Sequence, residues 1–229
     1  MTDTDVRREI VRVCRRLYER GLIAGADGNV SVRIARDHIL ITPRGYAKAD
    51  VEEHDLVLVT LDGTRIGGRH EASSEVAMHL AAYRAREDVG AVVHAHPPVA
   101  TGFAVAGFGL PGNVLPELAV QVGDVPFVPY ATPGTEALPD ALAPWLPNYD
   151  AFLLANHGAT TLGRTLAEAH QRMECVEHSA NILLTARLLG RVNALGAEDA
   201  RVLEAARRRA LVDGPVPGEA RSADAGRNA

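Results

Sequence analysis

The chain has 229 residues, with 24 Lys and Arg against 29 Asp and Glu, and a formal net charge of −5. Hydrophobic residues make up 47% of it, which is typical of a globular protein that buries a core without disulfide bonds. The mildly acidic balance argues against a broad nucleic-acid-binding face. Its two cysteines, Cys14 and Cys175, exclude a disulfide framework and a cysteine-rich zinc site. We find no secretory signal and no apolar run long enough for a membrane span, so we expect a cytoplasmic protein without a membrane or nucleic-acid partner.

The first third of the chain predicts two helices and three strands. Apolar residues over 6–18 recur at helical spacing, with Thr4 as the expected N-cap and Gly21 as the stop. Strands are expected over 30–34, 38–42 and 56–61. A second helix is expected to be capped by Ser73 or Ser74 and to end near Arg86.

The rest of the chain predicts buried strands over 89–95, 125–128 and 151–155 and helices over 166–189 and 197–211. Residues 101–116 show no clear pattern. Because helices alternate with strands while tight turns join several strand pairs, we expect a mixed sheet with helices on both faces. We expect one domain over 1–212 and a disordered tail over 213–229.

The strongest local motif is the pair His94 and His96 near the end of an expected strand. Side chains at i and i+2 of a strand share a face, so the two imidazoles can hold one metal ion; two histidines hydrogen-bonded at a strand end are the alternative. His157 follows another apolar strand, where it either ends the strand together with Gly158 or supplies a third imidazole. Three imidazoles on one ion leave an open position, which is typical of catalytic rather than structural sites.

Glu75 is the fourth candidate ligand. A carboxylate in the first turn of a helix suits the helix dipole, but it can also bind a metal and move protons. His79 lies one helical turn further along the same face and is an alternative ligand that the spacing leaves open.

Three short segments could bind an anion. Gly28-Asn29 opens a strand, Thr42-Pro43-Arg44-Gly45 closes one, and Ser73-Ser74 begins a helix. Glycines let backbone N–H groups approach a ligand, and Asn, Ser and Thr add donors. A helix N-terminus favours phosphate, and Arg44 adds charged donors. Each segment alone could equally be a turn or a cap.

Five segments, in this order and spacing, resemble the class II aldolase/adducin family, and most of all its L-fuculose-phosphate aldolase branch. The resemblance implies a three-layer α/β/α sandwich around a mixed, mainly antiparallel central sheet, and a homotetramer with active sites between subunits. The segments are Gly28-Asn29-Val30-Ser31, Ile41-Thr42-Pro43-Arg44-Gly45, Ser73-Ser74-Glu75, His94-Ala95-His96-Pro97 and His157-Gly158.

The resemblance also implies residue roles. His94, His96, His157 and Glu75 would hold one divalent metal ion, Zn²⁺ first, with Mn²⁺, Co²⁺ or Fe²⁺ as alternatives. Glu75 would be the acid/base as well. Glu117 stands where the aldolase branch has a tyrosine proton donor, and is a second catalytic candidate. Ala26 and Arg44 replace hydroxyl residues of that branch. The residues expected to bind the substrate phosphate are Gly28, Asn29, Arg44, Gly45, Ser73 and Ser74.

We therefore expect a metal-dependent class II aldolase that cleaves a ketose 1-phosphate, such as L-fuculose 1-phosphate, to dihydroxyacetone phosphate and an aldehyde. A sugar-phosphate 4-epimerase, dehydratase (methylthioribulose-1-phosphate type) or decarboxylase on the same metal site is the alternative, and a non-catalytic adducin-like scaffold is a further one. A Schiff-base aldolase needs a lysine nucleophile. The only lysine, Lys48, lies in a polar turn, where we expect it to be solvated.

Overall fold

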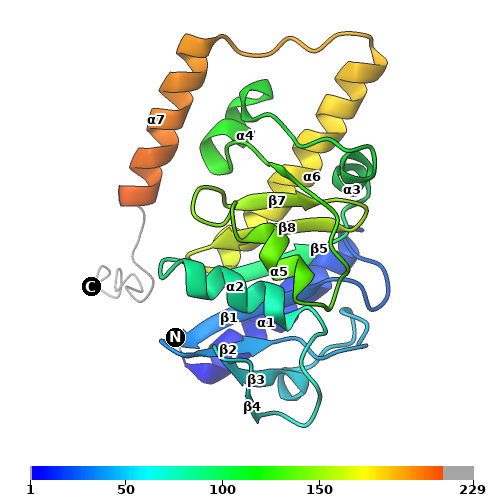
Figure 1. Cartoon of the computed structure of the whole chain (residues 1–229), viewed down its shortest axis with the longest axis vertical. Coiled ribbons are helices and arrows are strands. Elements are labelled where there is room, and N and C mark those ends of the chain that lie inside the picture. The colour runs from blue at the N-terminus through cyan, green and yellow to red at the C-terminus, as the bar shows by residue number, and fades with distance from the viewer. Residues whose placement is uncertain (1, 214–229) are drawn as a thin grey trace, which may run out of the picture.

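The fold is built around one eight-stranded sheet, seen in a computed structural model that describes residues 2–213, with side chains described through Arg209 (Figure 1). The strand order is β4-β3-β2-β1-β5-β8-β7-β6. Every neighbouring pair is antiparallel except β6 and β7. The predicted mixed, mainly antiparallel sheet is therefore confirmed. The strands are β1 (Asn29–Ala35), β2 (His38–Ile41), β3 (Val57–Thr60), β4 (Arg65–Gly67), β5 (Ala91–Ala95), β6 (Phe127–Val128), β7 (Ala151–Leu154) and β8 (Gly158–Gly163).

Helices cover both faces of the sheet and give the three layers. The seven helices of the described residues are α1 (Asp3–Glu19), α2 (Val76–Ala85), α3 (Pro98–Val105), α4 (Pro116–Gln121), α5 (Ala137–Leu142), α6 (Leu166–Leu188) and α7 (Ala197–Asp213). Two short 3₁₀ turns lie at Glu53–Asp55 and Gly112–Val114. One core joins α1, α3, α4 and α6 to one face of the sheet, and the other joins α2 and α5 to the opposite face.

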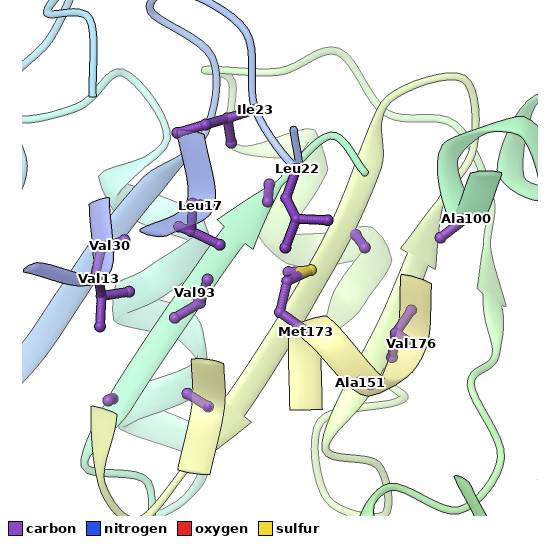
Figure 2. Close-up of a cluster of buried hydrophobic side chains, with 14 of the residues drawn as sticks. Val13, Leu17, Leu22, Ile23, Val30, Val93, Ala100, Ala151, Met173 and Val176 are labelled. Atoms are coloured by element: carbon purple, nitrogen blue, oxygen red, sulfur yellow. The ribbon is translucent and has the colours of Figure 1, made fainter. Parts of the chain in front are cut away.

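Side-chain alternation along the strands feeds these two cores. Ala91, Val93 and Ala95 of β5 point into the α1–α6 core, whereas Val92 points into the α2–α5 core, as the two-residue repeat of a strand requires. Figure 2 shows the first core, to which Val93 of β5, Leu17 of α1 and Met173 of α6 all contribute. The strand that carries His94, and that leads directly into His96, is thus fixed from both sides.

The structure changes several details of the predicted elements. Thr2, not Thr4, caps α1, and it forms a capping box with Asp5. Glu75 is the N-cap of α2, which begins at Val76 rather than directly after Ser74. The unpatterned segment 101–116 contains the end of α3 and the start of α4, and β4, β8 and α5 were not anticipated.

The chain end and the helix surfaces complete the fold. The expected tail lies outside the described residues, except that Asp213 ends α7. Figure 1 shows α7 joined to α6 by a long connection, and α7 packs on α4. Within the described residues, every helix is too short or too polar to cross a bilayer.

Candidate active site

Three histidines meet where β5 ends beside the turn between β7 and β8. His94 is in β5, His96 follows its end, and His157 is in that turn. Because β5 pairs with β8 in antiparallel register, with Ala95 opposite Ala159, the two strand ends lie side by side. One ring nitrogen of each histidine lies within 4.8 Å of the others. The structure thus brings together the three imidazoles that the sequence singled out.

Gly158 makes this close approach possible. A Cβ at this position would lie 2.5 Å from Cδ2 of His96 and 2.6 Å from the carbonyl oxygen of Ala95. These distances are far below ordinary van der Waals contact, so only glycine fits beside the histidines. Asn156, two residues before Gly158, adopts a left-handed conformation with φ of 53°, which Asn tolerates better than most residues. The turn therefore owes its shape to the Asn-His-Gly sequence.

Glu75 faces two of the three histidines from the N-terminus of α2. Its side chain is buried. Oε1 lies 3.1 Å from Nε2 of His157, and Oε2 lies 3.3 Å from Nε2 of His94. The side-chain amide of Asn29 donates a hydrogen bond of 2.8 Å to Oε2. Glu75 is therefore placed where it can reach both a cation held by the histidines and a substrate.

The electrostatics favour an ionised Glu75 and neutral rings at His94 and His96. Burial raises the pKa of Glu75, but His94, His157 and the Asn29 hydrogen bond outweigh it and hold that pKa well below its usual range. Burial lowers the pKa of His94 strongly, and it also lowers the pKa of His96. Neutral imidazole and ionised carboxylate are the forms that bind a metal ion.

The donor set fits a divalent cation. Nδ1 of His94 donates to the carbonyl of Ala159 at 3.0 Å, so its Nε2 carries a lone pair. That lone pair faces Nε2 of His96 at 3.1 Å and a carboxylate oxygen. Two nitrogens bonded to one tetrahedral zinc at about 2.05 Å are about 3.3 Å apart. Oε1 of Glu75 is buried without a hydrogen-bond donor. A cation among these groups would remove the repulsion between the nitrogen and oxygen lone pairs, and it would give Oε1 of Glu75 a partner.

His79 does not join this cluster, although the sequence left it open as a ligand. It is fully buried, and both of its ring nitrogens have other partners. Nδ1 lies 2.7 Å from the hydroxyl of Ser31, and Nε2 contacts the side-chain oxygen of Asn29. The imidazole is thus held between Ser31 and Asn29, with no ring nitrogen left for a metal ion.

A pocket of about 350 Å³ joins His96, His157 and Glu75 to the expected anion-binding segments. Gly28 has a φ of +68°, and a Cβ there would meet the His94 carbonyl oxygen at 2.6 Å, so this loop packs directly on β5. Backbone hydrogen bonds from Ser73 to Thr42 and from Arg44 to Glu71 join two of the segments. All six residues expected to bind phosphate line the pocket: Gly28, Asn29, Arg44, Gly45, Ser73 and Ser74.

Lys48 contradicts the expectation of a solvated lysine. Only 2% of it is exposed, and its ammonium donates hydrogen bonds of 2.8 Å to the carbonyls of Ala26 and Tyr46. Burial lowers its pKa. It lines the same pocket and ties two of its loops together. The polar turn in the sequence gave no sign of this, because the burial comes from packing of the two loops.

Asp27 is a second pocket residue to which the sequence assigned no role. Its Oδ2 lies 3.5 Å from Nδ1 of His96. A carboxylate on one ring nitrogen orients the other nitrogen toward a metal. The sequence signal for such a role is that Asp27 directly precedes the Gly28-Asn29 motif.

Glu117 lies elsewhere in this chain. It is exposed on α4 and does not line the pocket. Its carboxylate faces Cys175 of α6, whose thiol pKa is raised by burial and by this charge. The structure therefore does not bring Glu117 together with Glu75 within one chain.

Comparison with known proteins identifies the family. The sequence profile described as "Class II Aldolase and Adducin N-terminal domain" matches residues 8–184. The chain is 34% identical over 185 residues to a 3-oxo-tetronate 4-phosphate decarboxylase of Escherichia coli O6:H1, covering 79% of this chain and 87% of the relative. It is 31% identical over 178 residues to an L-fuculose phosphate aldolase of Methanocaldococcus jannaschii, covering 78% and 95%.

A solved structure has the same fold. YgbL of Klebsiella pneumoniae, described as a putative aldolase/epimerase/decarboxylase, superposes with a TM-score of 0.83 at 34% identity, covering 89% of this chain and 99% of that one. The α/β sandwich and the family resemblance inferred from the motifs are both confirmed. The relatives include more than one reaction type, so the family alone leaves the bond that is broken open.

Proposed function

Because the chain belongs to the class II aldolase and adducin family, an enzyme family of aldolase and decarboxylase type whose members act on sugar phosphates, we propose that it is a metal-dependent carbon–carbon lyase. The favoured reaction is aldol cleavage of a ketose 1-phosphate, such as L-fuculose 1-phosphate, to dihydroxyacetone phosphate and an aldehyde. The observation that carries this proposal is the buried Glu75 carboxylate between two histidines of a three-histidine cluster, in a pocket lined by anion-binding segments.

His94, His96 and His157, with Glu75, would hold the divalent ion, Zn²⁺ being the first choice for this donor set. When bound, such an ion supplies Lewis-acid stabilisation of the negative charge that develops on the substrate carbonyl oxygen. Asp27 orients His96, and the Ala159 carbonyl orients His94. These supporting contacts keep the lone pairs of both rings directed at one point.

The pocket residues would bind the phosphate end of the substrate. Ser73 and Ser74 supply hydroxyl donors, and the glycines Gly28 and Gly45 leave room for a phosphate to approach the backbone. Arg44 adds a positive charge at the rim. The side-chain amide of Asn29 already donates one N–H to Glu75, so its second N–H is the one left for a substrate oxygen.

Glu75 would move the proton. As the C3–C4 bond of a ketose 1-phosphate breaks, the C4 hydroxyl gives up its proton and becomes the aldehyde, and the electron pair of the bond stays on C3. The product dihydroxyacetone phosphate forms when an acid delivers a proton to that carbon. Among the carboxylates lining the pocket, Glu75 is the buried one and Asp27 is half-exposed. We therefore assign the proton transfer to Glu75.

Decarboxylation is the second candidate. A 3-oxo-tetronate 4-phosphate shares the phosphate–CH₂–CO–CHOH fragment with a ketose 1-phosphate, and it carries a carboxylate where the ketose carries the aldehyde-forming carbon. Loss of CO₂ leaves the same electron pair, but it needs no second acid/base for an aldehyde oxygen. Glu117 is outside the pocket of its own chain, and this observation favours the decarboxylase.

A role for Glu117 on the aldehyde side depends on assembly. We propose a homotetramer with active sites between subunits. In such an assembly Glu117 could act only at the pocket of a neighbouring copy, because its own α4 does not reach the histidines. A Glu117→Gln variant that lowers aldehyde release but not CO₂ release would assign it to the aldehyde side.

Product identification separates the two reactions. The metal-reconstituted enzyme is incubated with L-fuculose 1-phosphate, L-ribulose 1-phosphate or 3-oxo-tetronate 4-phosphate, and dihydroxyacetone phosphate is measured with a coupled dehydrogenase. Release with an equimolar aldehyde supports the aldolase, and release with equimolar CO₂ supports the decarboxylase. No release from any substrate would contradict the lyase proposal. Borohydride trapping of substrate on Lys48 would instead indicate a Schiff-base enzyme.

A further inference from the structure

A buried chain of hydrogen bonds runs from the back of α2 to the Glu75 carboxylate. It joins Tyr83, Ser31, His79 and Asn29 in that order. We propose that His79 and Asn29 are positioning residues: His79 fixes the orientation of the Asn29 amide, and Asn29 in turn fixes Glu75 for proton transfer. This inference rests on the proposed function, because that function assigns the proton transfer to Glu75.

The chain of contacts is continuous and buried. The Tyr83 hydroxyl lies 2.8 Å from Oγ of Ser31, and that Oγ lies 2.7 Å from Nδ1 of His79. Nε2 of His79 contacts Oδ1 of Asn29, whose Nδ2 donates to Glu75 at 2.8 Å. Tyr83, Ser31, His79 and Asn29 are each at most 3% exposed. Behind Asn29, which lines the pocket, the three other side chains have only each other as polar partners in this chain of contacts.

The donors and acceptors have one consistent assignment. An ionised Glu75 only accepts, so Asn29 presents its NH₂ to Glu75 and its carbonyl oxygen to His79. Nε2 of His79 must then be the protonated nitrogen. Burial lowers the pKa of His79 to about 4, so the ring is neutral near pH 7 and Nδ1 accepts from Ser31. The Ser31 oxygen in turn accepts from Tyr83.

This assignment gives His79 a specific effect on Glu75. If the His79 donor is lost, the Asn29 amide can rotate and turn its oxygen toward Oε2, where two acceptors repel. With the donor present, Oε2 is held by Asn29, and Oε1 is the oxygen without a hydrogen-bond donor. The relay therefore fixes Oε2 and leaves Oε1 directed at His157.

The first test reads the tautomer without any activity. In metal-free protein labelled with ¹⁵N-histidine, the His79 resonances are assigned by their loss in a His79→Gln variant. We expect a neutral ring protonated at Nε2, with Nδ1 as the acceptor, at pH 7. A ring protonated at Nδ1 would overturn the assignment and with it the proposal.

The second test measures the half-reaction that depends on Glu75. The assay follows exchange of a C–H hydrogen of dihydroxyacetone phosphate for deuterium from D₂O by the metal-loaded enzyme. Glu75 removes the proton from carbon, the proton exchanges with D₂O, and a deuteron is returned to the same carbon. We expect His79→Leu to lower the exchange kcat by about 10–100-fold, the usual effect of losing a supporting contact. KM should rise less than kcat falls, because His79 contacts the pocket only through Asn29, whereas Glu75 carries the proton transfer.

Two further variants separate positioning from folding. His79→Gln keeps an N–H donor near the Nε2 position and should recover exchange to within about fivefold of wild type. Tyr83→Phe removes only the far end of the chain of contacts and should leave the exchange kcat within about twofold. Equal losses in His79→Leu, His79→Gln and Tyr83→Phe would mean a purely structural role. If the wild type shows no exchange, that result would count against the proposed function. The ¹⁵N measurement of the His79 tautomer would still test the positioning role of His79 on its own.

Discussion

The packing of the three histidines predicts a large effect for one added methyl group, in Gly158→Ala. The new Cβ would lie 2.5 Å from Cδ2 of His96 and 2.6 Å from the backbone oxygen of Ala95. These atoms would have to separate by about 0.8 Å to reach ordinary contact, whereas metal–ligand distances tolerate about 0.2 Å. The conflict with a backbone atom cannot be resolved by a rotamer change.

The expected cost has two parts. Overpacking between β5 and β8 should lower the free energy of unfolding by about 1–3 kcal/mol. Displacement of His96 should weaken Co²⁺ or Zn²⁺ binding by at least about tenfold, as loss of ligand positioning does elsewhere. Urea denaturation of metal-free protein measures the first, and titration of metal-free protein with Co²⁺, followed by its visible absorption, measures the second.

Gly102→Ala is the matched control. Gly102 lies in α3, and a Cβ there would meet nothing within 4 Å. Alanine in a helix should be neutral or stabilising by up to about 1 kcal/mol, with unchanged Co²⁺ affinity. Wild-type stability and wild-type Co²⁺ affinity in Gly158→Ala would refute the close packing of the three histidines described above.

Three other variants test individual contacts. The pKa of Asp55 is about 2, because hydrogen bonds from Arg69, the Glu52 backbone and His70 outweigh burial. This shift contributes about 2 kcal/mol to the free energy of unfolding. The contribution should be full above about pH 4 and be lost as the pH falls through the native pKa. Urea denaturation should therefore show that Asp55→Asn is destabilised at pH 7 and by only about half as much at pH 3. An equal difference at both pH values would exclude this linkage. Lys48→Met should lower the unfolding free energy by about 1–3 kcal/mol, since two buried carbonyls lose their donor, and an unchanged urea midpoint would show that Lys48 does not hold the loops. Glu177 accepts from the backbone N–H groups of Val99 and Ala100, so Glu177→Ala should cost about 0.5–2 kcal/mol in thermal denaturation; no shift in Tm would mean that it does not cap α3.

The pairing of His94 with His96 could be predicted because the two residues are close in sequence. His94 and His96 are two residues apart on a strand, and a strand places such residues on one face. His157 joins them only because β5 pairs with β8, and β8 is not among the strands predicted from the sequence. Its sequence, Gly-Ala-Thr-Thr-Leu-Gly, has small residues and little apolar alternation, so it gives no strong strand signal.

The partners of buried polar groups could not be predicted in the same way. Lys48 lies in a polar turn, but the fold packs that turn against the loop that carries Ala26. His79 shares a helical face with Glu75, which made it a candidate ligand, yet strand β1 brings Asn29 and Ser31 to its two nitrogens. In each case a contact distant in sequence decides the role.

Glu117 shows the limit of assigning roles by position along the chain. Its place in the sequence matches that of a catalytic residue in the similar branch, whereas in the fold it lies on α4 beside α6. A position in the sequence does not determine which pocket, or which copy of the chain, a side chain reaches.

The central claim is that the three histidines hold a metal ion beside Glu75, which moves the proton in carbon–carbon cleavage. The most direct test compares wild type with Glu75→Gln, measuring metal content by mass spectrometry and dihydroxyacetone phosphate release from the best substrate. We predict one divalent ion per chain in both proteins, and release lowered by at least about 100-fold in the variant, the usual contribution of a general acid–base. Wild-type release by Glu75→Gln, or wild-type protein that is active without bound metal, would contradict the claim.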